Sequence, residues 1–275
     1  MARPLQRPDL ALAASLALFV AAVIWLLLTI LGSSGAHVPQ LAAEASAAET
    51  PTVAETQALP DVPGGRENPL VALPESGTPI LKVQPGSEIA LSAKPGGDPV
   101  VTLGDTTEFG SPTVLTVLER EGNWVGVPTE KLPNGELGWL KVSADASAYK
   151  VDSAGQEIIV DLSSLTAELK RGDEVERRWS IGIGAADTPT PTGRFSITDS
   201  LDNTFNPTYG CCILPISATQ PKLPAGWTGG NRMALHGTTS TLGQANSTGC
   251  IRNSEEDLRY LMSEIPLGTP VTIKN

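Results

Sequence analysis

The sequence predicts a mainly β protein that begins with a single transmembrane helix. Three features support this prediction. Residues 10–31 form one long apolar run, short apolar runs broken by turn residues fill most of the chain after residue 79, and a helical repeat is found near residue 258. Short β-type runs at even spacing are typical of barrels and sandwiches. We therefore expect an anchor, a linker and two β-rich domains, at residues 1–32, 33–78, 79–146 and 147–275.

The amino-terminal segment contains the apolar run. Its 22 residues, Leu10 to Leu31, would span roughly 33 Å as a helix, which is enough to cross a bilayer core. Arg3 and Arg7 precede the run, and the next basic residue is Arg66. The positive-inside rule then predicts a cytoplasmic amino terminus, with the rest of the chain outside the cytoplasm. A cleaved signal peptide is the alternative. Its apolar core is usually only about 7 to 15 residues long, although the Ala-rich residues 41–43 keep cleavage open.

Residues 33–78 are expected to form an extended linker. Seven prolines lie between Pro39 and Pro79, and six acidic residues of this stretch face a single base, Arg66. Such a composition cannot bury enough apolar surface to fold. The whole chain carries a net charge of −11 and has no basic run, so a nucleic-acid partner is not expected.

The first β-rich domain is predicted from a series of short apolar runs. The runs lie at residues 80–83, 88–91, 100–103, 114–118, 124–127 and 138–142. Asn134-Gly135, between the last two runs, is a typical hairpin turn. The segments around Trp124 and Trp139 resemble a bacterial SH3-like module, which implies a small barrel.

The second β-rich domain is predicted from similar runs and one helix. Apolar runs lie at residues 157–162, 166–169, 175–183, 194–198 and 271–273. Ser254 can cap a helix with Asp257 three residues later. Apolar residues then recur at positions i, i+3, i+4 and i+7, namely Leu258, Leu261, Met262 and Ile265, before Pro266 ends the pattern. One short helix is therefore expected just after Cys250.

A thiol and an imidazole stand out in this second domain. The chain has two histidines, of which His37 lies in the linker and His236 lies fourteen residues before Cys250. A cysteine nucleophile needs a nearby base, because a free thiol is mostly protonated at neutral pH. His236 and Cys250 therefore predict a catalytic dyad. The alternative for Cys250 alone is a small buried core residue.

The remaining cysteines and the single folded histidine limit other kinds of site. With three cysteines there is no disulfide framework. Neighbours Cys211 and Cys212 are expected to pack unbridged in a strand, because usual disulfides join Cα atoms about 4.4–6.8 Å apart, whereas a trans peptide fixes about 3.8 Å. The alternative is that one of them makes the site around Cys250 redox-sensitive. No zinc-type ligand spacing occurs, so neither a metal nor another cofactor is expected.

Three motifs of the second domain follow one another in a characteristic order. They are Thr190-Pro191-Thr192-Gly193-Arg194-Phe195, Leu235-His236-Gly237-Thr238 and Ser247-Thr248-Gly249-Cys250-Ile251-Arg252. Together they resemble the catalytic domain of YkuD-type L,D-transpeptidases over roughly residues 150–275. The anchor, linker and SH3-like module resemble the usual architecture of such enzymes. The family commonly has a histidine where this chain has Thr248, which leaves open how that position holds substrate, and the interval from His236 to Cys250 is short, which suggests a trimmed loop.

The resemblance implies acyl transfer on peptidoglycan. Cys250 would attack the carbonyl of the third residue of a tetrapeptide stem, expel the terminal D-alanine and form a thioester. A side-chain amine of another stem would resolve the thioester into a 3→3 cross-link, and carbapenems would acylate the cysteine. His236 would act as the base, held in one tautomer by the carbonyl of Gly237.

The sequence leaves the roles of several other residues open. Backbone N–H groups near Gly249 can meet the oxyanion, and this glycine allows a tight turn. Arg252 binds a stem carboxylate or forms a structural ion pair. Ser247 contacts substrate or, as we favour, supports the turn. Tyr209 lines the donor pocket or packs in the core. In the first domain, Trp124 and Trp139 belong either to a wall-binding or substrate-positioning module or, as slightly favoured, to the core of a spacer.

Several functions compete with the transpeptidase. The same chemistry supports an L,D-carboxypeptidase or an enzyme that attaches proteins to the wall. An NlpC-type endopeptidase would have its cysteine before its histidine, whereas here His236 comes first. A non-catalytic wall-binding protein would leave His236 and Cys250 idle. We expect a single-pass cell-membrane enzyme of cell-wall biogenesis whose catalytic domain faces the wall.

Overall fold

The computed structural model describes residues 71–202 and 206–275. The predicted anchor, residues 1–32, and most of the predicted linker lie outside these residues. Within the described ranges, none of the helices has the length and apolar character needed to cross a bilayer. All described residues belong to one compact unit, Gly65–Asn275, so contacts between its β domains are part of its structure.

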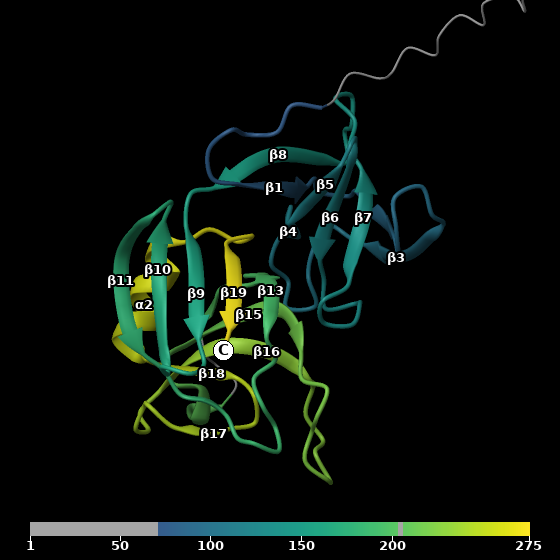
Figure 1. The fold of residues 1–275 in the computed structure, drawn as a ribbon. Helices are drawn as coiled ribbons and strands as arrows, with labels where there is room; N and C mark the ends of the chain where they lie inside the picture. Colours follow the sequence, from purple (N-terminus) through teal and green to yellow (C-terminus); the bar gives the residue numbers. More distant parts are fainter. Residues whose placement is uncertain (1–70, 203–205) are drawn as a thin grey trace, which may run out of the picture. The chain divides into compact units, whose positions relative to one another are not determined.

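The amino-terminal β domain consists of two antiparallel sheets (Figure 1). Its strands are β1 (Thr78–Val83), β2 (Ile89–Ser92), β3 (Pro99–Leu103), β4 (Val114–Thr116), β5 (Glu119–Glu121), β6 (Trp124–Pro128), β7 (Leu137–Lys141) and β8 (Tyr149–Ala154). One sheet has the order β4-β1-β8 and the other β3-β2-β7-β6-β5. Each predicted apolar run of this domain overlaps one of these strands. Leu81, Leu91, Val125 and Val127 are fully buried between the sheets, because alternate strand residues point to the same face.

The carboxy-terminal β domain is built on a five-stranded and a four-stranded sheet. Its elements are β9 (Glu157–Asp161), β10 (Thr166–Arg171), β11 (Glu174–Ser180), β12 (Ile183–Gly184), β13 (Gly193–Ser196), β14 (Leu201–Asp202), the 3-10 helix η1 (Pro207–Tyr209), β15 (Cys212–Thr219), β16 (Arg232–Thr238), β17 (Ala245–Ser247), β18 (Ile251–Ser254), α2 (Glu255–Glu264) and β19 (Pro270–Lys274). The sheet orders are β11-β10-β9-β19-β13, visible across Figure 1, and β14-β15-β16-β18, with β12 and β17 paired separately. The described fold is therefore mainly β.

The predicted helix is confirmed as α2. The Ser254 hydroxyl accepts a hydrogen bond from the Asp257 N–H at 3.0 Å, which satisfies one of the free donors of the first turn. Leu258 and Leu261 are fully buried, and α2 packs on the four-stranded sheet at β15, β16 and β18. The helix follows β18 directly, so it fixes the end of the strand that begins just after Cys250.

The two β domains contact each other through hydrogen bonds. The Asn134 side chain donates to the carbonyl of Thr219 at 2.6 Å and accepts from its N–H at 2.9 Å. The Thr116 hydroxyl donates to the carbonyl of Gly268 at 2.6 Å in a buried position. β8 begins two residues after the predicted domain boundary and pairs with β1 of the first domain. The Asn134 contact joins the predicted hairpin turn to the end of β15, the strand next to the histidine strand β16.

Candidate active site

Three adjacent strands bring the predicted dyad together. β16 runs antiparallel to β15, with Ile213 opposite His236, and parallel to β18, with His236 opposite Arg252. Cys250 is the residue just before β18, at the end of the turn formed by residues 248–250. Two residues fourteen positions apart are therefore neighbours in space. Both His236 and Cys250 line one cavity of about 290 Å³.

The imidazole of His236 is buried and held by one hydrogen bond. Its side chain is 3% exposed, and Nδ1 lies 2.8 Å from the carbonyl oxygen of Gly237. Because a carbonyl only accepts, Nδ1 carries the proton and Nε2 keeps its lone pair. Burial lowers the pKa of His236 and the positive charge of Arg252 lowers it further, while the bond to Gly237 opposes this. A neutral imidazole with a free Nε2 is the form that a general base requires.

Burial also favours the neutral form of the Cys250 thiol. Cys250 is half-buried and is the free cysteine of the described residues. Burial raises the pKa of its thiol, and the Ala234 N–H and the Arg252 charge only partly offset this. Both shifts disfavour a thiolate–imidazolium pair, so a thiol that attacks here would lose its proton to the base during the attack.

The turn before Cys250 is fixed by hydrogen bonds from three sides. The Ser247 hydroxyl donates to the carbonyl of Cys250 at 2.6 Å and accepts from the Gly249 N–H at 3.1 Å. The Thr190 hydroxyl donates to the carbonyl of Gly249 at 2.6 Å. The Gln220 amide donates to the carbonyl of Thr248 at 3.2 Å. Ser247 thus supports the turn, as favoured from the sequence, and the Gly249 N–H is occupied, so an oxyanion must be met by other N–H groups.

Gly249 itself is required by its backbone conformation. Its φ of +111° is rarely adopted by residues with a side chain, and a Cβ there would lie 2.1 Å from Nε2 of Gln220. Gln220 was not predicted as a site residue, because nothing in its sequence neighbourhood marks it. Thr190 lies in the first of the three motifs, and that motif was the available signal for it.

Tyr209 lies directly against the imidazole. Its ring meets that of His236 edge to face, with centroids 5.0 Å apart and planes at 77°. Burial raises the pKa of Tyr209, and the nearby Cys250 adds to this. Gly210 follows with a φ of +61°, and a Cβ there would lie 2.5 Å from the Gly237 carbonyl carbon. A glycine thus lets η1 approach the peptide that holds the imidazole.

Arg252 lies in the same cavity and points to a neutral partner. Its Nη1 donates to the side-chain oxygen of Asn246 at 2.7 Å. Among the residues that the structure describes, no carboxylate is within ion-pair distance of Arg252. The guanidinium is therefore available to a carboxylate of a ligand, whereas the structural ion pair is not formed. Thr248 also lines this cavity.

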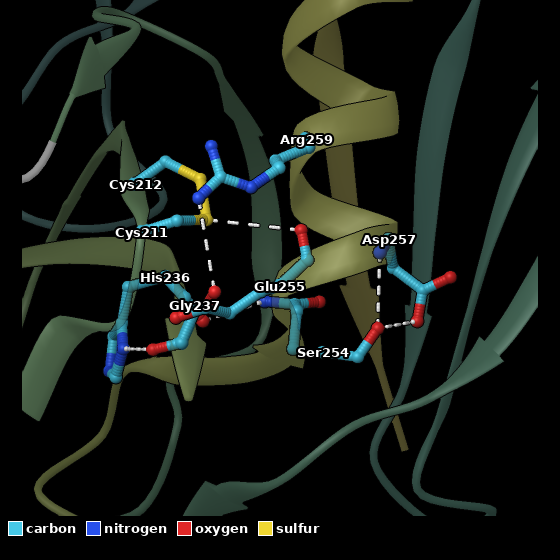
Figure 2. The surroundings of a disulfide bond; sticks show 9 residues. Cys211, Cys212, His236, Gly237, Ser254, Glu255, Asp257 and Arg259 are labelled. Carbon is cyan, nitrogen blue, oxygen red and sulfur yellow. Dashed lines mark hydrogen bonds and ion pairs between the residues drawn. A yellow bond between two sulfur atoms is a disulfide. The ribbon is translucent and has the colours of Figure 1, made fainter. Parts of the chain in front are cut away.

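The prediction that Cys211 and Cys212 are unbridged is wrong. The structure joins them in a disulfide, with Cα atoms 3.7 Å apart (Figure 2). The usual Cα separation describes cysteines on separate segments, whereas neighbouring side chains can turn toward each other. The bridge packs against Gly237, where an added Cβ would lie 3.3 Å from Cys211 Sγ. Cys211 Sγ also lies 3.8 Å from the carbonyl oxygen of Glu255. Neither sulfur lines the two cavities that open at Cys250.

A second cavity also opens at the thiol. It has a volume of about 250 Å³ and is lined mainly by apolar side chains, including Ile213, Pro215 and Ala234. Cys250, Tyr209, Gly230 and Arg232 line both cavities, whereas His236 lines only the first. The thiol thus lies between a polar and an apolar cavity. Within the described ranges, no group of three or more His, Cys, Asp or Glu side chains could hold a metal ion.

The chain resembles proteins of one family over its carboxy-terminal part. Residues 155–273 match the family model of YkuD, the L,D-transpeptidase catalytic domain. A Bacillus licheniformis protein that bears the name L,D-transpeptidase YkuD is 32% identical over 124 residues, which cover 44% of this chain and 67% of that protein. The Bacillus subtilis protein of the same name is 32% identical over 118 residues, which cover 42% of this chain and 64% of that protein. The chain thus spans about two thirds of the length of these relatives.

Solved structures also match part of the chain. The crystal structure of an L,D-transpeptidase from Mycobacterium tuberculosis H37Rv has a TM-score of 0.40 and 14% sequence identity, and the match covers 59% of this chain and 90% of that one.

Proposed function

Because the chain belongs to the YkuD family of L,D-transpeptidases, we propose that it joins peptidoglycan stem peptides by 3→3 cross-links through a thioester on Cys250. The observation that carries this proposal is the shared cavity of Cys250 and His236, in which Nδ1 of the imidazole is fixed by Gly237 at 2.8 Å. This arrangement gives a neutral thiol a neutral base, which is what acyl transfer to sulfur needs.

Acylation begins at the carbonyl of the third stem residue. Cys250 Sγ forms a bond to the carbonyl carbon while its proton passes to Nε2 of His236. The tetrahedral intermediate then breaks its C–N bond, and the imidazolium returns the proton to the departing amine of D-alanine. The thioester remains on Cys250, and the imidazole is neutral again.

In deacylation His236 again acts as the base. A side-chain amine of a second stem attacks the thioester carbon and loses one proton to His236. The C–S bond breaks, and the proton passes to the sulfur to restore the thiol. Water in place of the amine gives the carboxypeptidase reaction, and an amine of a protein gives attachment of that protein to the wall.

The cavity that His236 lines also has groups that can bind the D-alanine that departs and the stem that brings the incoming amine. The Arg252 guanidinium has no carboxylate partner among the described residues, so it can bind the carboxylate of the terminal D-alanine or of the acceptor stem. Tyr209 places its ring against His236 and closes one side of the cavity. Thr248 lines the same cavity at the position where the family commonly has a histidine, and its hydroxyl is available to a peptide group.

The proposal includes the place of the reaction. Residues 1–32 anchor the enzyme in the cell membrane with the amino terminus in the cytoplasm, and residues 33–78 hold residues 79–275 toward the wall. In this arrangement the SH3-like module is the amino-terminal β domain, predicted as residues 79–146, and its last strand β8 continues past that limit to Ala154.

Mass spectrometry of the full-length protein in detergent tests the proposed chemistry. Incubation with a disaccharide-tetrapeptide is expected to give a Cys250 adduct and a stem dimer that has lost one D-alanine, and a carbapenem is expected to give a stable adduct on Cys250. Cys250→Ser should give neither. Hydrolysed tripeptide without dimer would replace the proposal by the carboxypeptidase. Absence of every adduct on the folded protein would favour the non-catalytic wall-binding protein.

A further inference from the structure

Large apolar side chains are exposed around the thiol. Among the described residues, those with more than a third of their surface exposed include Val100, Phe109, Val151, Val175, Leu223 and Trp227. Of these, Phe109, Leu223 and Trp227 line the two cavities that open at Cys250. Exposed apolar surface that gathers at one place usually marks a binding site.

Phe109 does not come from the catalytic domain. It lies between β3 and β4 of the amino-terminal β domain, is 40% exposed, and forms one wall of the apolar cavity beside Cys250. Its loop is held from both sides. The Thr107 hydroxyl accepts from the Phe109 N–H at 3.2 Å and donates to the fully buried carboxylate of Asp199, in the catalytic domain, at 2.5 Å. The aromatic ring is therefore presented to the cavity by a fixed loop.

Arg232 ties this loop to the histidine strand. It is the first residue of β16, its side chain is 9% exposed, and its Nη2 lies 2.8 Å from Glu108 and 3.0 Å from Glu130. Its guanidinium carbon lies 5.7 Å from the centre of the Phe109 ring. Nη1 donates to Thr198 and to the carbonyl of Ile216. Because two carboxylates and two oxygens engage the guanidinium, Arg232 is a positioning residue rather than a ligand for substrate.

The two cavities suit different parts of the substrate. His236 must exchange protons with the departing and the incoming amine, and it lines the polar cavity but not the apolar one. Both amines therefore approach from the polar side. The acyl part of the donor is then left to the other cavity at Cys250, which Phe109 lines. Arg232 is paired with Glu108 and Glu130, and the other side chains that line this cavity are uncharged, so the cavity fits uncharged, aliphatic parts of a peptide.

We propose that the amino-terminal β domain completes the donor subsite, with Phe109 as the wall that packs on the uncharged acyl part of the donor stem. This inference rests on the proposed function and adds to it a residue from outside the matched family region, residues 155–273. The first domain is then a substrate-positioning module, the interpretation that the sequence alone placed slightly behind a spacer.

Single-turnover acylation of the full-length protein tests the assignment. The variant Phe109→Ala removes the wall, Phe109→Leu keeps an apolar wall, and Val100→Ala, 54% exposed on β3, is the matched control. Acylation of Cys250 by the disaccharide-tetrapeptide is expected to slow about tenfold in Phe109→Ala and to be largely restored in Phe109→Leu. The control should react like the wild type, and all variants should keep the wild-type melting temperature, because Phe109 is partly exposed.

Two further rates separate the alternatives. Aminolysis of preformed acyl-enzyme and alkylation of Cys250 by iodoacetamide are expected to stay within about twofold of wild type in Phe109→Ala. Unchanged donor acylation, or an effect confined to aminolysis, would overturn the donor assignment while leaving the transpeptidase in place. If the wild type is alkylated by iodoacetamide but accepts no acyl group from the tetrapeptide, the proposed function fails, and the donor assignment fails with it.

Discussion

Replacing Gly249 by alanine tests whether the turn before the nucleophile is built as described. A Cβ at this position meets two costs. The φ of +111° is strained for alanine, which costs about 1–3 kcal/mol, and the Cβ would lie 2.1 Å from Nε2 of Gln220. The amide must move, and it now donates to the carbonyls of Thr188, Pro189 and Thr248.

The magnitude follows from these two costs. Each lost hydrogen bond contributes about 0.5–1.5 kcal/mol, so with the backbone strain the free energy of unfolding should fall by about 3 kcal/mol or more. For a protein of this size that corresponds to a melting temperature lower by about 6–12 °C. Because Thr248 and Gly249 fix the place of Cys250, a shift of about 1 Å should lower kcat/KM for stem acylation about 100-fold.

Gly243 provides the matched control for this experiment. It also has a positive φ, +73°, but no atom lies within 4 Å of the Cβ that an alanine would add there. Gly243→Ala should therefore show backbone strain alone, with a small loss of stability and near-normal kcat/KM. The assay is thermal unfolding followed by Cys250 acylation measured by mass spectrometry. If Gly249→Ala behaves like Gly243→Ala in both measurements, the close packing of Gln220 on the turn is not what positions the thiol.

Three further outcomes are expected. Because burial lowers the pKa of His236, kcat/KM for acylation should decrease as the pH is lowered, with a midpoint below pH 6.5. Because burial raises the pKa of Cys250, the rate of alkylation by iodoacetamide should increase as the pH is raised, with a midpoint above pH 9. An alkylation rate that already reaches its plateau near pH 6 would instead indicate a thiolate–imidazolium ion pair. Ser247→Ala should lower the free energy of unfolding by about 1–3 kcal/mol and kcat about tenfold, with an unchanged KM. The control Ser240→Ala, at an exposed position, should change neither quantity. A raised KM in Ser247→Ala would mean that Ser247 contacts substrate. The denatured protein should show one reactive thiol without reductant and three after reduction; three thiols in both cases would contradict the Cys211–Cys212 bridge.

Local patterns predicted some elements well. Helix α2 was found from the apolar repeat after Ser254, because that repeat and its cap depend only on neighbouring residues. Strand β16 was not predicted, and β15 was expected only around its first residue, Cys212, although both strands hold the site. β15 contains Pro215 and is buried along nearly its whole length, so it lacks the alternation by which a half-exposed strand is recognised. Its pairing with β16 also shifts register after Pro215.

The site likewise consists of residues that the sequence marks and residues that only tertiary packing brings to it. Cys250 and His236 were predicted because both residue types are scarce in the chain. Their place at one cavity depends on the parallel pairing of β16 with β18. Gln220 and Phe109 lie far from the motifs in sequence and reach the site only through tertiary packing, so no local pattern could identify them. The Cys211–Cys212 bridge was missed because a rule for distant cysteines was applied to neighbours.

A neutral pair of thiol and imidazole suits the proposed reaction, in which two substrates meet the base in turn. In that reaction His236 accepts a proton from the thiol in the first step and from an amine in the second, so it must return to the neutral form between them. Its burial favours that neutral form, and the fixed Nδ1–Gly237 bond keeps Nε2 available throughout. In the proposed reaction the thiol, whose pKa is raised by the same burial, gives its proton to His236 only as it attacks the carbonyl carbon of the donor.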